Sequence, residues 1–350
     1  MIWVTWRQFR GTILAGVMIP LLVAAVVAAV TGFADRIGSN YVLFRCFGLS
    51  TTTCLAESTL TLSSLATIAL PVMLGVFVGV TIFSRDIERG THVLGLTQSI
   101  GRMRWYWTRV LVVFPPIVLA MAVLGYVVLW SRFGTSPYGP SFVDMYYSRL
   151  EFPTFGTIAS APAGYTLLGL TIGATAALLV RNTIGAMMIT VVCTTAMIII
   201  FPLSIREHYA SPDITRQALE ISESNASVAY EMNPDNTERP GWKVGTHYVD
   251  SAGAQVDLGY DECSRNDNDW PEPADDETTS NFDDRVDAYI EESDRIRIAC
   301  LRDLGIDHFE TRSFADRQLW RFQFTEAALC LFVAAALAGS STLIVRRLQP

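Results

Sequence analysis

Six long runs of apolar residues constrain this chain of 350 residues more than any other feature. Each run is about 20 residues long, the length of helix that crosses a bilayer core about 30 Å thick. Backbone groups in lipid must be paired within their own segment, so such runs are expected to be helices. They cover residues 12–33, 60–83, 110–130, 163–180, 183–203 and 327–345. The sequence therefore predicts a mainly α-helical, polytopic membrane protein with six transmembrane helices.

Charge is distributed unevenly along the chain. Residues 204–321 hold 27 of the 34 acidic residues but only 12 of the 26 basic ones. Short loops on the cytoplasmic side of membrane proteins are enriched in Lys and Arg. If the N-terminus is cytoplasmic, ten arginines fall in inside segments and four in short outside loops. We therefore expect both termini to be cytoplasmic and the acidic segment to be a small extracytosolic α/β domain between helices five and six.

These expectations give a complete map of the chain. It consists of a cytoplasmic amphipathic segment at 1–11, helices at 12–33, 60–83, 110–130, 163–180, 183–203 and 322–345, outside loops at 34–59 and 131–162, a cytoplasmic loop at 84–109, an inside turn at 181–182, the outer acidic domain at 204–321 and a cytoplasmic tail at 346–350.

Four of the six cysteines fall in segments expected outside, and none falls in a cytoplasmic segment. Disulfides persist in oxidising compartments, so paired thiols would fit this orientation. Four cysteines allow three connectivities. We favour the local pairs Cys46–Cys54 and Cys263–Cys300 over the crossed ones, with four free thiols as the alternative.

The acidic segment carries signals for several elements. Ser211 or Asp213 could cap a helix that reaches about Glu231. Alternating apolar residues around a turn near Gly253 predict a hairpin over 242–258. Apolar residues at helical spacing predict a second helix over 280–304, which Gly305 would end.

Small residues within the expected spans indicate close contacts between helices, and one acidic residue there is a candidate functional residue. Two Gly-xxx-Gly pairs, Gly75 with Gly79 and Gly169 with Gly173, would let helices approach closely. Glu326 is the only acidic residue close to the expected hydrocarbon region. Ionisable groups in that region are functional by default, although Glu326 could also lie in the interface.

Several kinds of chemistry are missing from the chain. A phosphate-binding P-loop needs a lysine, and the single lysine, Lys243, lies in the segment expected outside. Metalloprotease and nucleophile-elbow motifs are also missing, so we expect neither catalysis nor a metal site in this chain. Any energy for transport would have to come from a partner. The scarcity of lysine beside abundant arginine indicates a GC-rich bacterial genome.

The loop at 84–109 contains motifs that resemble those of a known family. Its run Glu88-Arg-Gly-Thr-His92, followed by Thr97-Gln-Ser99 and Arg102-x-Arg104-Trp105, resembles permease subunits of actinobacterial type-2 ABC exporters. The opening Thr5-Trp-Arg-Gln8, the segment Arg206-x-His208-Tyr209 and the run Leu319-Trp-Arg-Phe-Gln-Phe-Thr-Glu326 are similar to the same family. Leu96 and Phe324 replace tryptophans that are usual there.

This resemblance implies a permease that dimerises in the bacterial plasma membrane and binds two copies of a separate ATPase, which would hold ATP and Mg. The loop at 84–109 would form a coupling helix in a groove of that ATPase. The docking residues it implies are Arg85, Asp86, Glu88, Arg89, Gly90, Thr91, His92 and Gln98. Arg102, Arg104 and Trp105 would anchor the next helix at the membrane surface.

Two other readings stay open. The chain could be an ATPase-coupled signalling or mechanotransmitting protein that acts on an outside partner through the acidic domain. It could also be an integral membrane enzyme, which the lack of polar clusters within the spans disfavours. The sequence does not identify a transported substrate.

Overall fold

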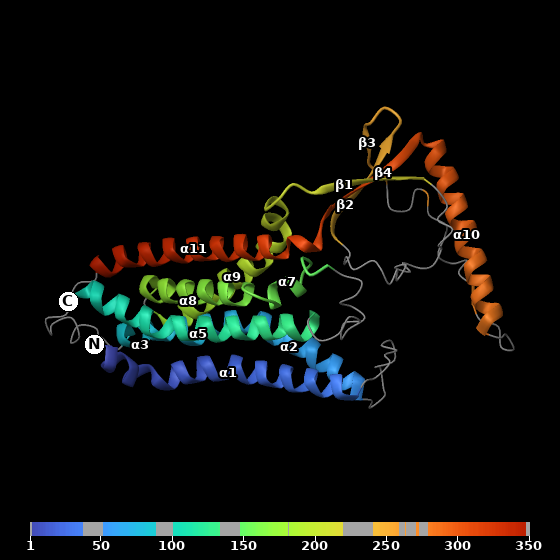
Figure 1. The fold of residues 1–350 in the computed structure, drawn as a ribbon. Helices are drawn as coiled ribbons and strands as arrows, with labels where there is room; N and C mark the ends of the chain where they lie inside the picture. Colours follow the sequence, from blue (N-terminus) through green and yellow to red (C-terminus); the bar gives the residue numbers. More distant parts are fainter. Residues whose placement is uncertain are drawn as a thin grey trace. The chain divides into compact units, whose positions relative to one another are not determined.

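The computed structural model describes residues 2–37, 52–88, 101–133, 148–180, 182–219, 241–258, 263, 271–272 and 279–347. Within these ranges, the side chains of 33–37, 52–60, 279–280, 283 and 347 are not described. The chain forms two compact units (Figure 1). Unit 1 comprises Met1–Tyr209 and Arg317–Pro350, and unit 2 comprises Ala210–Asp316.

Unit 1 is a bundle of helices. Its elements are α1 (Ile2–Ile37), α2 (Thr52–Leu74), η2 (Gly75–Val80), α3 (Thr81–Glu88), α5 (Arg102–Phe133), α7 (Thr154–Thr157), α8 (Ala161–Val180), α9 (Thr183–Ile200), η3 (Phe201–Ile205), η4 (Arg206–His208) and α11 (Leu319–Arg347), the last preceded by the short η6 (Asp316–Gln318).

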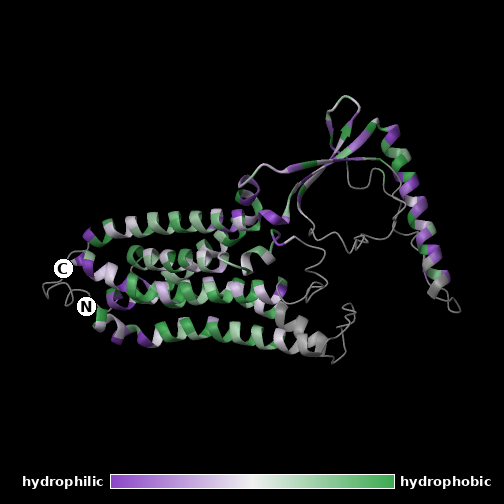
Figure 2. Ribbon diagram, viewed as in Figure 1, coloured by the Kyte–Doolittle hydropathy of each residue, from purple (hydrophilic) through white to green (hydrophobic). Residues whose placement is uncertain are grey.

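Six helical segments in the described ranges are long and apolar enough to cross a membrane. They are Ile2–Gly32, Thr61–Glu88, Arg102–Phe133, Ala161–Val180, Thr183–His208 and Asp316–Arg346. Figure 2 shows that their middle parts are hydrophobic and that hydrophilic residues gather toward their ends. The predicted fold class, a mainly helical chain with six such helices and a small α/β region, is confirmed.

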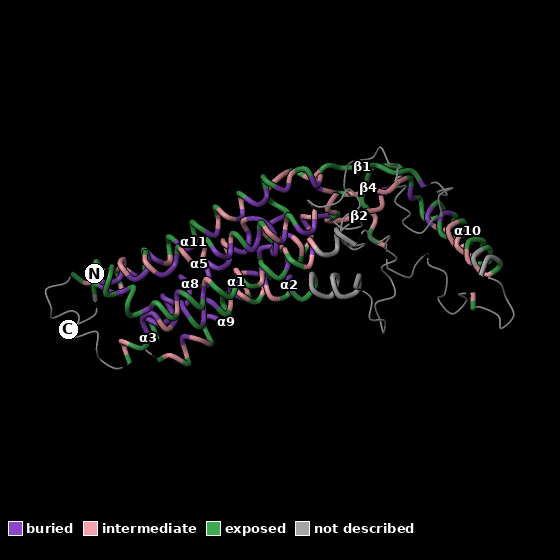
Figure 3. The backbone as a smooth tube through the Cα atoms, turned by 60° about the horizontal axis from the view of Figure 1, so that its bottom comes forward, coloured by how far each residue is buried: buried purple, intermediate pink, exposed green. Residues whose placement is uncertain are grey.

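Helix α8 lies at the centre of the bundle, where it packs against α2, η2, α5, α9 and α11 (Figure 3). Two of its glycines, Gly169 and Gly173, lie against the α2–η2 segment, as the Gly-xxx-Gly pattern predicts. A Cβ atom on Gly75 would lie 2.7 Å from the carbonyl oxygen of Gly169, and one on Gly79 would lie 2.7 Å from that of Leu170. Backbones this close leave room only for glycine.

The six candidate spans run in alternating directions along the chain, so their ends form two groups (Figure 1). One group, here called the terminal end, contains the start of α1 and the end of α11 (Figure 1). There the Arg102 guanidinium donates to the carbonyl of Arg346 over 3.0 Å, and the Arg109 guanidinium lies 5.3 Å from the ring centre of Phe9. The other group, the opposite end, contains the end of α9 and the start of α11.

Unit 2 combines a four-stranded sheet with one long helix. The strands β1 (Asp213–Ala218), β2 (Trp242–Asp250), β3 (Gln255–Val256) and β4 (Ile306–Phe314) are antiparallel in the order β1-β4-β2-β3. The helix α10 (Thr279–Asp303) contributes Ile298 and Leu301 to a core with Leu219 and Ile306. A disulfide joins Cys263 to Cys300 of α10, the pairing favoured from the sequence.

The structure corrects one element of unit 2. The helix expected to begin at Ser211 or Asp213 is wrong, because Asp213–Ala218 forms strand β1. This strand pairs along its whole length with β4, from Asp213 opposite Ser313 to Ala218 opposite His308. The predicted hairpin and second helix are both present: β2 pairs with β3 around Gly253, whose φ is +83°, and Gly305, whose φ is +79°, follows α10.

Candidate functional site

Helix α3 leads into the loop predicted to dock a partner, and a buried ion pair ties it to α5. Arg109 of α5 donates from Nη2 to the Asp86 carboxylate and from Nη1 to the carbonyl of Ile82 over 2.8 Å. Its guanidinium also lies 4.4 Å from the ring centre of Trp105, which in turn packs on Phe83. The guanidinium of Arg109 is therefore bound to groups within the bundle.

The second carboxylate of α3 also binds its own chain. Glu88 Oε1 accepts a hydrogen bond of 2.6 Å from the backbone N–H of Thr183, the first residue of α9. Arg85, on the same short helix, is exposed. Of the three described residues predicted to dock, two thus have intramolecular partners and one faces outward.

The other predicted residues fall into two groups. Arg89, Gly90, Thr91, His92 and Gln98 lie outside the described residues. Among the predicted surface anchors, Arg104 is exposed and Arg102 is half-buried, whereas Trp105 is buried inside the bundle by its contacts with Arg109 and Phe83.

Exposed arginines gather at the terminal end. They are Arg7 and Arg10 of α1, Arg85 of α3, Arg104 of α5 and Arg346 of α11. Exposed indole rings of Trp3 and Trp6 accompany them on α1. Arginine beside tryptophan is typical of a helix end at a membrane surface, where the charge meets headgroups and the ring lies at the apolar boundary.

At the opposite end, Glu326 of α11 is the centre of a buried polar cluster. Its carboxylate accepts hydrogen bonds from Arg206 Nε and Nη2, each 3.1 Å long. The hydroxyls of Tyr165 and, over 3.3 Å, Tyr209 also donate to it. The side chains of Arg206 and Glu326 are each only 1 % exposed. The sequence singled out Glu326 as a candidate, and the structure supplies its partners.

The remaining contacts of Arg206 complete the cluster. Its Nη1 donates to the carbonyl of Leu150 over 3.2 Å, and its guanidinium lies 3.9 Å from the ring centre of Phe155 in α7. Burial, and then the nearby Glu326 carboxylate, raise the pKa of Tyr209 above its ordinary value. Tyr209 therefore keeps its proton and acts as a donor.

Gln323, one helical turn before Glu326, joins α11 to the start of α8. Its Oε1 accepts hydrogen bonds from the backbone N–H groups of Ser160 (3.1 Å) and Ala161 (3.0 Å) and from the hydroxyl of Ser160 (3.0 Å). Its Nε2 donates to the carbonyl of Phe155 over 3.1 Å. The first N–H groups of a helix have no partner within it, so Gln323 caps α8 from another helix.

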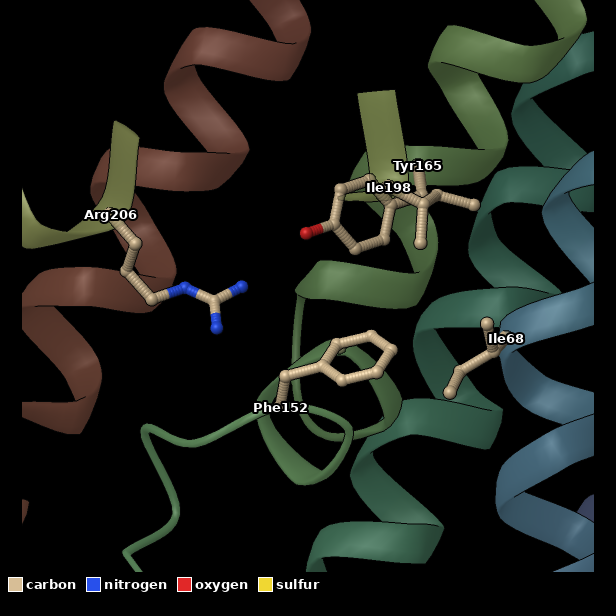
Figure 4. Close-up of a pocket in the computed structure, with 6 residues that line it drawn as sticks. Ile68, Phe152, Tyr165, Ile198 and Arg206 are labelled. Atoms are coloured by element: carbon tan, nitrogen blue, oxygen red, sulfur yellow. The ribbon is translucent and has the colours of Figure 1, made fainter. Parts of the chain in front are cut away.

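A small pocket lies beside the cluster (Figure 4). Its cavity volume is about 10 Å³, and it is lined by Ile68, Phe152, Gly156, Tyr165, Ile198 and Arg206. In Figure 4 the Arg206 guanidinium points from η4 toward the hydroxyl of Tyr165. The space matches about one water molecule, too small for a transported compound in this conformation.

Sequence reasoning missed the partners in both ion pairs. Arg206 belongs to a segment that resembles the family, and Arg109 is one of the ten arginines expected in cytoplasmic segments. The sequence signal for a buried ion pair was that both arginines lie beside a long apolar run. Of the other predicted site residues, Cys46 and the side chain of Cys54 lie outside the described part of the chain.

Comparison with models of protein families gives a match to this chain. A family model described as "ABC-2 membrane transporter related" matches residues 16–206, which is more than half of the chain. The matched region runs from α1 to Arg206 and includes the α2–η2–α3 segment and α5. No curated protein and no solved structure matches the chain significantly.

Proposed function

The chain belongs to the ABC-2 membrane transporter related family, and from this premise we propose that it is the permease of an ATP-driven exporter powered by a separate ATPase. Membership in the family and six apolar helices make it a multi-pass membrane protein with a transport role. The export direction, the actinobacterial source and the coupling to an ATPase are parts of the proposal.

The proposal places the terminal end in the cytoplasm of a bacterial cell, with unit 2 outside. The exposed arginines of that end support this orientation through the enrichment of basic residues on the cytoplasmic side. The disulfide Cys263–Cys300 supports it from the other side, since disulfides persist outside the reducing cytoplasm. Two permease copies would bind two ATPase subunits, and ATP and Mg would be held there.

The segment 84–109 is proposed as the docking element, and the observation that carries this assignment is the way α3 is held. Asp86 is bound to α5 and Glu88 to the start of α9. A push on the loop would therefore reach two transmembrane helices directly. Exposed Arg85 would contact the partner, together with Arg89, Gly90, Thr91, His92 and Gln98, while Asp86 and Glu88 hold the base of the loop.

A co-purification experiment tests the docking assignment. We expect the chain to be isolated from native membranes together with a subunit that hydrolyses ATP. Replacing Glu88 and Arg89 by Ala should abolish this association, because the first change releases α3 from α9 and the second removes a docking charge.

The matched control removes the same two charge types from unit 2. Glu291 and Arg295 form an exposed ion pair of 2.9 Å on α10, so Glu291→Ala with Arg295→Ala should leave co-purification unchanged. Association that survives the change at Glu88 and Arg89 would disprove docking through this segment.

A further inference from the structure

The contact between α8 and α11 depends on polar groups at the opposite end of the bundle. Gln323 and Glu326 lie one turn apart on α11, and both enter the region where α7, α8 and η4 meet. Toward the terminal end, the contact is made by small side chains. Cys330 lies against Gly164, and the hydroxyls of Thr175 and Ser341 are 2.9 Å apart.

Stability alone does not account for a charged pair at this position. Removing two charges from water is costly, and an apolar pair of similar volume is often as stable or more so. A buried pair differs from apolar packing because losing either partner leaves the other charge unpaired. Loss of one partner of this pair would therefore be costly in a way that loss of an apolar contact is not.

The backbone around the pair is irregular. Arg206 follows η3, a π-helical segment over Phe201–Ile205, and begins the 3-10 turn η4. Ala159, beside the Ser160 that Gln323 holds, has a φ of +52°, a conformation that non-glycine residues rarely adopt. π-helical turns and strained residues occur often at positions that move or function. The pocket beside Arg206 provides a small free volume.

We propose that Arg206 and Glu326, with Tyr165 and Tyr209 as donors, form an ionic latch that holds α11 and η4 closed against α8. When the latch breaks, the first turns of α11 separate from α8, and water enters the α8–α11 contact from the opposite end. The latch rests on the geometry of unit 1 alone and does not require the proposed ATPase coupling.

A native cysteine reports the state of the latch. Cys330 lies one turn beyond Glu326 on the face toward α8, and it is 1 % exposed. With Cys46, Cys54 and Cys193 changed to Ser and the Cys263–Cys300 disulfide kept, Cys330 is the single free thiol. The test measures how fast a small, charged methanethiosulfonate reagent labels it in membranes that contain the full chain.

We expect slow labelling in the parent chain and labelling at least about tenfold faster in Glu326→Gln, because that change leaves the Arg206 charge buried without its counter-charge. The double variant Arg206→Met with Glu326→Leu should label as slowly as the parent, since apolar packing replaces the pair. Asp86→Asn, which breaks the ion pair at the terminal end, should also label slowly.

Three results would overturn the latch. Glu326→Gln could label as slowly as the parent, which would mean that the pair does not hold the contact closed. The double apolar variant could label as fast as Glu326→Gln, which would show that exposure of Cys330 does not follow from an unpaired charge. Asp86→Asn could speed labelling as much as Glu326→Gln does, which would indicate general loosening of the bundle.

Discussion

Gln323 makes four side-chain hydrogen bonds at one point of the bundle, so its loss should be costly. Its single amide accepts from two backbone N–H groups and one hydroxyl and donates to one carbonyl, all at the start of α8 or in α7. Gln323→Met keeps the volume but leaves these groups buried without partners. Each such group costs about 1–3 kcal/mol, so we expect a loss of at least that size.

Thermal unfolding in detergent measures this loss. Gln8→Met, at an exposed position of α1, makes the same chemical change without removing a buried contact and should leave the unfolding temperature unchanged. If the two variants unfold at the same temperature, the hydrogen bonds of Gln323 contribute no net stability.

Single residues also show where sequence reasoning ends. Glu326 stands out because an acid beside an apolar run is costly. Its partner Arg206 is 120 residues away, and no periodicity links two positions that only folding brings together. Asp86 and Arg109 are only 23 residues apart but lie on different helices, so the sequence assigned them separate roles. The docking assignment itself stays a prediction.

Among the elements, α8 and the α2–η2 segment meet at a glycine contact that leaves no room for a larger side chain. A Cβ on Gly169 would lie 2.5 Å from the carbonyl oxygen of Pro71, and one on Gly75 would lie 2.7 Å from that of Gly169. Gly169→Ala and Gly75→Ala should each destabilise the bundle by about 1–3 kcal/mol, because the two backbones must move apart.

Gly339 of α11 is the matched control for that contact. A Cβ there would meet no atom within 4 Å, so Gly339→Ala should be neutral or stabilising by up to about 1 kcal/mol, as alanine is the better helix former. Detergent unfolding of the three variants measures the difference. Equal unfolding temperatures would show that the bundle adjusts to a larger side chain at the glycine contact.

Elements defined by local pattern were predictable, and those defined by distant pairing were not. The apolar runs indicated six helices, and the Gly305 stop marked the end of α10. Strand β1 was mistaken for a helix because its six residues are all exposed and show no buried alternation. Its hydrogen-bonding partner, β4, lies about 95 residues further on, and no strand is predicted there from the local pattern.

For the whole molecule, the six helices bring the first and last described residues to the same end of unit 1 (Figure 1). That end also carries α3, so the proposed docking segment and both ends of the described chain share one side. An even number of crossings requires this arrangement. The six apolar runs and the distribution of arginines predict both termini on one side, and which side is cytoplasmic stays part of the proposal.

The position of the buried cluster has a practical consequence for engineering. Along the chain, Arg206 precedes unit 2 and Glu326 follows it, and the two side chains form an ion pair. Within unit 2 the first strand, β1, is paired with the last strand, β4, with Asp213 opposite Ser313. The first and last strands of unit 2 are therefore neighbours in its sheet. Replacing 210–316 by a short glycine-serine linker should yield a bundle that still inserts and resists proteolysis, whereas the same graft carrying Glu326→Gln should be cut readily. Such a result would mean that residues 210–316 can be exchanged for another domain without redesign of the helices of unit 1.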